Sequence, residues 1–189
     1  VYAGGASDRV FGGSGNDLLL GDSGEGPDSI LGGSGNDTLE GHDGNDSLSG
    51  GDGNDSLNGG DGADSINAGG DADNVFGGNG ADNIDGGLGD DTLNGDGGND
   101  TINGNTGNDT ILGGADQDSL LGGDGNDIIN AGAGNDTITG DAGFDSLLGG
   151  DGLDSIAGGN DNDTINGESG NDTISGDALI HLANAKSAG

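Results

Sequence analysis

The sequence predicts an all-β fold in which short parallel strands stack into a solenoid. Three observations support this prediction. A nine-residue period runs through almost the whole chain, one position of each repeat is always Asp, and the residue two places later is always aliphatic. Between Gly32 and Asn58 the consecutive repeats read GGSGNDTLE, GHDGNDSLS and GGDGNDSLN. Positions 1 to 9 are counted from the first residue of such a repeat, which puts Asp37 at position 6 and Leu39 at position 8.

The composition excludes several other classes of protein. Only 27% of the 189 residues are hydrophobic, with one Tyr and three Phe, which is too little for a conventional globular core. Fifty glycines and a net charge of -34 would by themselves indicate a disordered acidic linker. Because Arg9 and Lys186 are the only basic residues, the chain offers no basic surface to nucleic acid and no attraction to an anionic membrane. Cations are the partners that this charge requires.

Cysteine is absent, which excludes disulfides and thiolate metal sites. No apolar run is long enough for direct insertion into a membrane, and the N-terminus lacks the pattern of a signal peptide. Val1 and Tyr2 fall on positions 8 and 9 of a repeat. We therefore expect the chain to be a piece of a longer protein.

The aspartates at position 6 form a ladder of 19 residues. Every step is nine residues except the eleven between Asp17 and Asp28, where an insertion around Ser23 to Pro27 interrupts the register. The ladder consists of Asp8, Asp17, Asp28, Asp37, Asp46, Asp55, Asp64, Asp73, Asp82, Asp91, Asp100, Asp109, Asp118, Asp127, Asp136, Asp145, Asp154, Asp163 and Asp172.

Position 8 is Val, Ile or Leu in all 19 repeats. A disordered linker has no reason to keep an aliphatic residue at a fixed period, so we expect an ordered fold, at least once a ligand is bound. These residues are Val10, Leu19, Ile30, Leu39, Leu48, Leu57, Ile66, Val75, Ile84, Leu93, Ile102, Ile111, Leu120, Ile129, Ile138, Leu147, Ile156, Ile165 and Ile174.

Each repeat is expected to contain one turn and one very short strand. Positions 7 and 9 are mostly polar and flank the aliphatic residue, which predicts a three-residue strand with one inward side chain. Positions 1 to 6 predict a turn, because Gly adopts positive φ angles without steric cost and Asn and Asp are the next most tolerant. Where position 2 or 4 is not Gly, as at His42 and Asp71, the turn is expected to persist at a local cost.

Two repeats make one coil of 18 residues, with a strand on each of two opposed faces. Successive coils stack their strands in parallel about 4.8 Å apart, so the position-8 side chains of both faces meet in a thin central core. The predicted fold is a right-handed parallel β-roll, a β-solenoid of about nine coils, over residues 1–175. The tail 176–189 leaves the pattern, and Leu179, Ile180 and Leu182 are expected to lie over the last coil.

The ladder predicts a metal site. Aspartates that are 18 residues apart should lie on the same edge of the roll in adjacent coils, about 5 Å from one another, where they repel and share a cation. Unpaired turn carbonyls complete an all-oxygen shell, which suits Ca²⁺ better than Mg²⁺. The inward aliphatic residues do not offset the entropy of ordering this backbone. We therefore predict that the calcium-free chain is largely unfolded.

The repeat resembles the G-G-x-G-x-D-x-U-x motif of RTX (repeats-in-toxin) calcium-binding proteins, in which U is a large aliphatic residue. Repeats such as Gly32 to Glu40 match every defined position, and the resemblance covers about residues 1–175. It implies that each Ca²⁺ lies between two loops of one edge, bound by the Asp and two carbonyls of each loop. Transferred to this chain, one site would use the carboxylates of Asp37 and Asp55 and the carbonyls of Gly32, Ser34, Gly51 and Gly53.

The other sites follow by translation along the two edges. Ten aspartates on one edge and nine on the other give nine and eight gaps, hence up to 17 Ca²⁺ ions. The loop of Asp28 carries the insertion and Pro27. We therefore expect the sites between Asp8 and Asp28 and between Asp28 and Asp46 to be distorted or empty.

The sequence shows no constellation for catalysis. His42 and His181 lie far apart in the repeat pattern, and the abundant Ser residues have no base beside them. The Ser/Thr column at position 7 is compatible with an ice-binding face, but it occurs on both faces, which favours ordinary β propensity. The denser apolar cluster from Phe11 to Leu31 is expected to pack against a neighbouring domain of the same parent chain or against a second roll.

The sequence therefore predicts a calcium-binding structural module and not an enzyme. The resemblance implies export by type I secretion machinery, with the chain unfolded in a low-calcium cytoplasm and folded into a rigid rod outside the cell or at its surface. There it would serve as a spacer, stabiliser or assembly element of its parent, and any catalytic domain would lie elsewhere in that parent. The alternative is self-association into an extracellular filament, surface layer or adhesin, with rolls stacked end to end or side by side.

Overall fold

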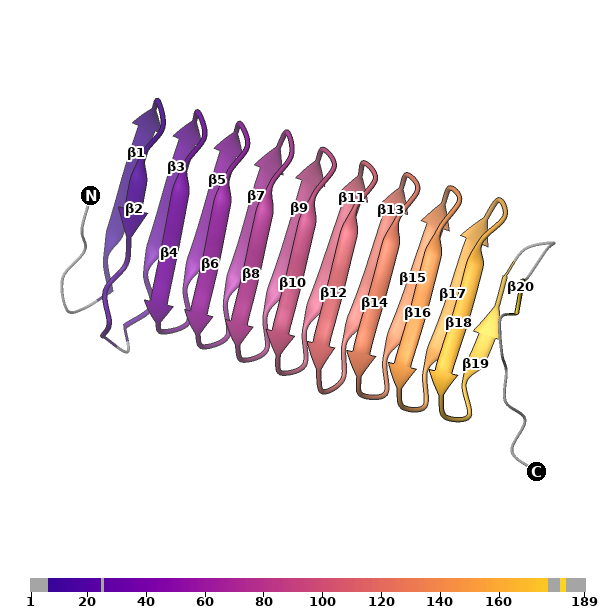
Figure 1. Ribbon diagram of the computed structural model, residues 1–189. Coiled ribbons are helices and arrows are strands. Elements are labelled where there is room, and N and C mark those ends of the chain that lie inside the picture. Colours follow the sequence, from indigo (N-terminus) through magenta and orange to yellow (C-terminus); the bar gives the residue numbers. More distant parts are fainter. Residues whose placement is uncertain (1–6, 25, 177–180, 183–189) are drawn as a thin grey trace.

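The computed structural model describes residues 7–24, 26–176 and 181–182 of the chain. In this part of the chain, twenty strands form two sheets of ten strands each that face one another across a narrow core (Figure 1). One sheet contains the odd-numbered strands in sequence order and the other the even-numbered strands. All neighbouring strands pair in parallel. The predicted parallel β-solenoid of about nine coils is confirmed.

The strands follow one another at the spacing of the repeat. The odd sheet contains β1 (Arg9–Ser14), β3 (Ser29–Ser34), β5 (Ser47–Asp52), β7 (Ser65–Gly70), β9 (Asn83–Leu88), β11 (Thr101–Thr106), β13 (Ser119–Asp124), β15 (Thr137–Ala142), β17 (Ser155–Asn160) and β19 (Thr173–Ser175). The even sheet contains β2 (Leu18–Leu20), β4 (Thr38–Asp43), β6 (Ser56–Asp61), β8 (Asn74–Asn79), β10 (Thr92–Gly97), β12 (Thr110–Ala115), β14 (Ile128–Ala133), β16 (Ser146–Asp151), β18 (Thr164–Ser169) and β20 (His181–Leu182).

Equivalent positions of successive coils lie directly beside one another. Leu93 of β10, for example, pairs with Val75 of β8 on one side and with Ile111 of β12 on the other. The register survives the insertion, because Val10 of β1 pairs with Ile30 of β3. The two extra residues are therefore accommodated in the turn between β2 and β3, and the strands on either side keep their alignment.

The strands are longer than the sequence predicts. A strand that begins at position 7 continues through positions 1 to 3 of the next repeat, so β4 has six residues, Thr38–Asp43, where three were expected. Only positions 4 to 6 remain as the turn. The physical reason is the stacking of near-identical backbones, in which even a glycine with positive φ, such as Gly33 at 120°, lies beside its counterpart, here Gly13 and Gly51.

The residues other than Gly at positions 2 and 4 also keep the turn conformation, as predicted. All eight have φ angles between 62° and 77°, in the left-handed region that side chains with a Cβ rarely adopt. They are His42, Asp71, Asp96, Asn105, Asp116, Asp141, Asp161 and Glu168.

The core is a double column of aliphatic side chains between the two sheets. Every position-8 residue from Val10 to Ile165 is at most 3% exposed, and Ile174 in the last coil packs against this cluster. Successive side chains of a strand point to opposite faces, which turns positions 7 and 9 outward. The predicted inward column is therefore confirmed for these residues.

The described part of the C-terminal tail adds one strand to the even sheet. His181 and Leu182 form β20 and pair with Thr164 and Ile165 of β18. Leu182 thus stands at position 8, one residue earlier than the regular count, which would place Ala183 there. Leu179 and Ile180, expected to cap the last coil, lie outside the described residues. No helix long and apolar enough to cross a membrane occurs in the described part of the chain.

Candidate metal centres along the two edges

The turns place the position-6 aspartates in two columns, one along each edge of the roll (Figure 1). Turns that lead from an odd to an even strand carry Asp17, Asp37, Asp55, Asp73, Asp91, Asp109, Asp127, Asp145 and Asp163. Turns that lead from an even to an odd strand carry Asp28, Asp46, Asp64, Asp82, Asp100, Asp118, Asp136, Asp154 and Asp172, and Asp8 precedes β1 on the same edge.

Aspartates of adjacent coils contact one another along each column. The backbone N–H of Asp91 donates a hydrogen bond of 2.8 Å to Oδ1 of Asp109, whose own N–H donates one of 2.9 Å to Oδ1 of Asp127. Seventeen such bonds of 2.7 to 3.1 Å connect the described ladder, nine on one edge and eight on the other. Ladder aspartates of adjacent coils are therefore neighbours on each edge, which is the arrangement that the repeat spacing predicts.

The second carboxylate oxygen is buried without a partner at most of these positions. Burial of an unpaired carboxylate oxygen is costly, so an array of such atoms indicates that the edge is built for a cation. Among the described residues, Oδ2 has no hydrogen-bond partner in fifteen: Asp17, Asp37, Asp46, Asp55, Asp64, Asp73, Asp82, Asp91, Asp100, Asp109, Asp118, Asp127, Asp136, Asp145 and Asp154.

Burial raises the pKa of many of these carboxyl groups above the ordinary value of 3.8. The pKa rises to about 6 for Asp64 and Asp109 and to about 7 for Asp73 and Asp100. Desolvation is the main cause, and the charges of neighbouring aspartates add to it, while the backbone N–H donor of the preceding coil opposes it. Without a counter-ion, the ionised form of these carboxylates therefore destabilises the fold at neutral pH.

Backbone carbonyls face the same gaps between coils, as the gap between the Asp37 and Asp55 turns illustrates. A Cβ atom built on Gly32 would lie 2.5 Å from Oδ2 of Asp37 and 2.6 Å from the carbonyl oxygen of Gly50. These two oxygens, one from each coil, therefore converge on one small region. Ala68 and Ala131 show that a methyl group at position 1 is also accommodated, since both are fully buried.

Three more carbonyls face this gap. The oxygens of Gly33 and Gly35 point toward the later coil, where a Cβ atom built on Gly51 or on Gly53 would clash with them. The Asp52 carbonyl points back toward the earlier coil and accepts the N–H of Gly35 at 2.8 Å.

These directions correct the carbonyl set that was expected for this site. The Gly32 carbonyl faces the preceding coil, 2.6 Å from a Cβ built on Gly12, and Ser34 accepts the Gly15 N–H there at 2.7 Å. The Gly51 carbonyl faces the following coil at Gly69. Carbonyls at position 4 point the same way as those at position 2, as Gly33 and Gly35 show, so the Gly53 carbonyl also faces the following coil. Carbonyls at positions 1 and 3 thus point one way along the stack and those at 2 and 4 the other way. The repeat implies this alternation, but only the winding of the coils decides its direction.

Six oxygen atoms therefore converge on each regular gap, and two of them also accept a backbone N–H from the earlier coil. In the example they are Asp37 Oδ2, Asp55 Oδ1 and the carbonyls of Gly33, Gly35, Gly50 and Asp52. Six oxygens with two carboxylates are a donor set that suits Ca²⁺. No three acidic or histidine side chains gather in the part of the chain that the structure describes, so main-chain oxygens must supply most of each shell.

A second ladder, for which the repeat pattern predicts no role, runs along the edges at position 5. The Oδ1 atom of Asn108 accepts the N–H of Asn126 at 2.9 Å, and Oδ1 of Asn126 accepts the N–H of Phe144 at 2.8 Å. Asn16 and Asn36 form the same contact near the N-terminus at 3.1 Å. The frequency of Asn at position 5 was the available signal. These amides hold the turns together outside the carboxylate column.

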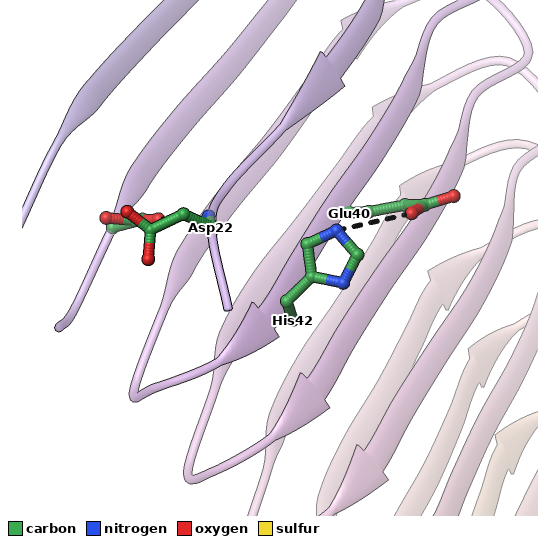
Figure 2. Close-up of polar contacts among 4 residues, drawn as sticks. Asp22, Glu40 and His42 are labelled. Atoms are coloured by element: carbon green, nitrogen blue, oxygen red, sulfur yellow. Dashed lines mark hydrogen bonds and ion pairs between the residues drawn. The ribbon is translucent and has the colours of Figure 1, made fainter. Parts of the chain in front are cut away.

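The histidine that the structure describes in full takes no part in these gaps. His42 Nε2 lies 3.6 Å from Glu40 Oε2, and both side chains are about 40% exposed on β4. Figure 2 shows the two side chains meeting each other, apart from Asp22 in the turn before β3. His42 therefore lies on the outer surface of the roll, away from the aspartate columns.

Comparison with known proteins gives an independent line of evidence. A family model described as RTX calcium-binding nonapeptide repeat (4 copies) matches residues 1–26, 22–57, 49–84, 76–111, 85–120, 112–147 and 148–178. These segments overlap or adjoin and extend over the repeats that the sequence analysis identified. None of the curated proteins compared with the chain matches it.

Proposed function

Because the chain belongs to the family of RTX calcium-binding nonapeptide repeat proteins, we propose that it is a module of a secreted protein that folds when it binds Ca²⁺. In this proposal the module is unfolded at low calcium and becomes a rigid rod outside the cell. It then serves as spacer, stabiliser or assembly element for the protein that carries it.

One observation carries the proposal: among the residues that the structure describes, fifteen aspartates bury a carboxylate oxygen that has no hydrogen-bond partner. The hydrophobic core is small, because each strand contributes essentially one large aliphatic side chain to it. Hydrophobic burial therefore stabilises the roll only modestly. The same fold holds columns of carboxylates at hydrogen-bonding distance from one another's backbone. A chain with net charge -34 therefore needs cations at the edges before folding becomes favourable.

The proposed ligands of a regular gap are two aspartates and four carbonyls. At the gap described above, Asp37 and Asp55 would contribute Oδ2 and Oδ1, with the carbonyls of Gly33, Gly35, Gly50 and Asp52 completing the shell. Bound Ca²⁺ would supply the positive charge and the metal–oxygen bonds that offset the burial of these carboxylates. Translation along the ladder gives up to 17 such gaps, the number of Asp–Asp contacts described above.

Each interior aspartate belongs to two gaps. Asp109 directs Oδ1 toward Asp91 of the preceding coil, while Oδ2 remains for the gap toward Asp127. Ordering this side chain for one gap orders it for the next one as well. We therefore expect calcium binding to be cooperative along each edge and inseparable from folding.

The dependence on calcium accounts for the proposed route of the protein. Inside a cell with little free Ca²⁺ the carboxylates repel one another, and the chain stays extended and competent for type I export. Outside, the millimolar Ca²⁺ that extracellular modules use would fold it. Folding after translocation would then oppose return of the chain.

A calcium titration tests this proposal. Circular dichroism of the chain in chelator should show little β structure, and added Ca²⁺ should produce it in one cooperative step. Calorimetry should count many ions per chain, and Mg²⁺ at equal concentration should fail to replace them. β structure that persists in excess chelator, or a stoichiometry of one or two ions, would refute the proposal.

A further inference from the structure

The ladder aspartate in the turn between β2 and β3 differs from the fifteen described aspartates whose Oδ2 has no partner. Asp28 is 4% exposed, and its Oδ1 accepts the N–H of Asp8 at 2.9 Å, as in the rest of the ladder. Its Oδ2, however, accepts the backbone N–H of Asp22 at 3.2 Å. Asp28 is therefore a deeply buried ladder aspartate whose two oxygens both have a hydrogen-bond donor.

The donor, Asp22, immediately precedes the insertion, and an inserted residue holds its side chain in place. Asp22 is itself 8% exposed, and its Oδ1 accepts the N–H of Gly24 at 2.5 Å. This contact closes a tight local turn that directs the Asp22 N–H toward Asp28. Figure 2 shows the Asp22 side chain in this turn beside the N-terminal coils.

The stacking of the coils is otherwise preserved at this point. The N–H of Asp28 donates to Oδ1 of Asp46 at 2.8 Å, as the regular pattern requires. A Cβ built on Gly44 would lie 2.7 Å from the carbonyl oxygen of Gly26, so that carbonyl faces the later coil like a position-4 carbonyl. The gap between Asp28 and Asp46 thus keeps its shape, but it has one N–H donor more than a regular gap, on the Oδ2 atom that is unpaired elsewhere.

That N–H changes what the gap can bind. In a regular gap the orphaned Oδ2 gains a partner only from a cation, whereas Asp28 Oδ2 already accepts a charge-assisted hydrogen bond. The hydrogen atom also carries partial positive charge, so a cation at Oδ2 would be repelled by it and would have to displace it. The residues of this gap therefore do not fit the ion that the other gaps fit.

We propose that the gap between Asp28 and Asp46 is closed by the Asp22 N–H in place of Ca²⁺. This inference rests on the proposed function of the other gaps. It divides the carboxylate ladder of this edge into Asp8 and Asp28 on one side and the run from Asp46 to Asp172 on the other. No ion is shared across the division, so the cooperative run of this edge begins at Asp46.

A two-residue deletion should remove the hydrogen bond between the Asp22 N–H and Asp28. Deletion of Gly26 and Pro27 turns the segment from Gly21 to Leu31 into GDSGEDSIL, a regular nonapeptide with the aspartate at position 6. The shortened turn places Asp22 at position 2, where Asp96 and Asp141 already occur. Its N–H then belongs to the strand and no longer reaches the carboxylate.

Native mass spectrometry of the calcium-saturated chain, which counts bound ions directly, tests the proposal. The deletion should bind one more Ca²⁺ than the unaltered chain. Among point variants, Asp64→Asn, which affects the gaps toward Asp46 and Asp82, should lose two ions, whereas Asp28→Asn should lose at most one. The two Asn variants change the same chemical group, so each serves as the control of the other.

The outcomes separate this inference from the proposed function. Equal losses of ions in the two Asn variants would overturn the inference whatever the deletion does. Asp8→Asn affects only the gap toward Asp28, so an equal loss in Asp8→Asn and Asp28→Asn supports the inference even if the deletion fails to fold, and a larger loss in Asp28→Asn overturns it. A chain that binds no calcium at all would instead refute the proposed function. Hydrogen exchange in calcium-saturated solution gives a second readout. The Asp22 amide should exchange slowly in the unaltered chain because it donates to Asp28, and its exchange rate should change on deletion.

Discussion

The backbone N–H of Asp91 donates to Oδ1 of Asp109 at 2.8 Å, across 18 residues of sequence. Oδ2 of Asp91 and Oδ2 of Asp109 are both buried and have no partner. One oxygen of each carboxylate thus fixes the spacing of two coils, and the other is left for a ligand. The same arrangement recurs along both edges, so a change at one aspartate should be felt in two gaps.

Asp109→Ala should remove a ligand from the gaps toward Asp91 and toward Asp127. We expect two fewer bound ions, a local loss of affinity of at least about tenfold, as for other changes close to a metal, and reduced cooperativity. Native mass spectrometry counts the bound ions, and a calcium titration followed by circular dichroism gives the midpoint and the cooperativity. Asp124→Ala is the matched control, because it removes the same charge from an exposed side chain. An unchanged midpoint and ion count for Asp109→Ala would mean that aspartates are not shared between gaps.

Acid should partly replace calcium. The carboxyl groups of Asp73 and Asp100 have pKa values of about 7 in the fold against an ordinary 3.8. Between these values the calcium-free fold holds more protons than the unfolded chain, so its stability falls as the pH rises through this window. The penalty is absent below about pH 4 and complete above about pH 7. In chelator, circular dichroism should therefore show more β structure at pH 5 than at pH 8.

Calcium affinity should have the opposite dependence on pH. Protons and cations compete for the same carboxylates of the folded chain, so the calcium concentration at half-saturation should rise where acid populates the calcium-free fold, between about pH 6 and pH 4. At neutral pH the calcium-free chain is unfolded and its carboxylates are already ionised, so the midpoint should change little between about pH 8 and pH 6. Calorimetry in two buffers of different ionisation enthalpy should detect protons released on binding at about pH 5. If chelator leaves β structure at that pH but binding releases no protons, the ladder carboxylates are ionised in the folded chain without calcium.

The aliphatic column should dominate the stability of the calcium-loaded roll. Ile111 is fully buried, whereas Leu112, the next residue, is 38% exposed. Ile111→Ala should lower the free energy of unfolding by about 2 to 5 kcal/mol, from lost burial and the cavity that remains. Leu112→Ala should cost less than about 1 kcal/mol. Urea unfolding in saturating calcium compares the two, and equal losses would show that the column is not the core.

Glycine at position 2 should be sensitive to substitution for a backbone reason. Gly114 has a φ of 118°, and an added Cβ would press on the carbonyl oxygen of Asp96 in the preceding coil. Gly114→Ala should therefore cost about 1 to 3 kcal/mol. A Cβ on Gly97 meets nothing closer than 3.7 Å, so Gly97→Ala is the control and should be nearly neutral. Thermal unfolding in calcium would contradict this if the two variants had the same midpoint.

The sequence by itself determined the period of the coil, the inward column and the two columns of aspartates. Each of these follows from local rules that repeat at every nonapeptide. Side chains alternate across a strand, so Leu39 must turn inward if Thr38 and Glu40 turn outward. Repetition at nine residues then places Asp37 and Asp55 on one edge and Asp46 on the other. Positive φ angles at His42 and Asp71 follow from their positions in the turn in the same way.

Only the tertiary structure decided the features that depend on how one coil lies on the next. Strands run through positions 1 to 3 because a stacked copy pairs with them, which the conformation of an isolated repeat does not predict. The carbonyls of Gly33 and Gly50 face one gap because of the direction in which the coils wind. The hydrogen bond from Asp22 to Asp28 depends on the path of two inserted residues. In each case the contact joins different coils or lies in an irregular turn, so no local pattern specifies it.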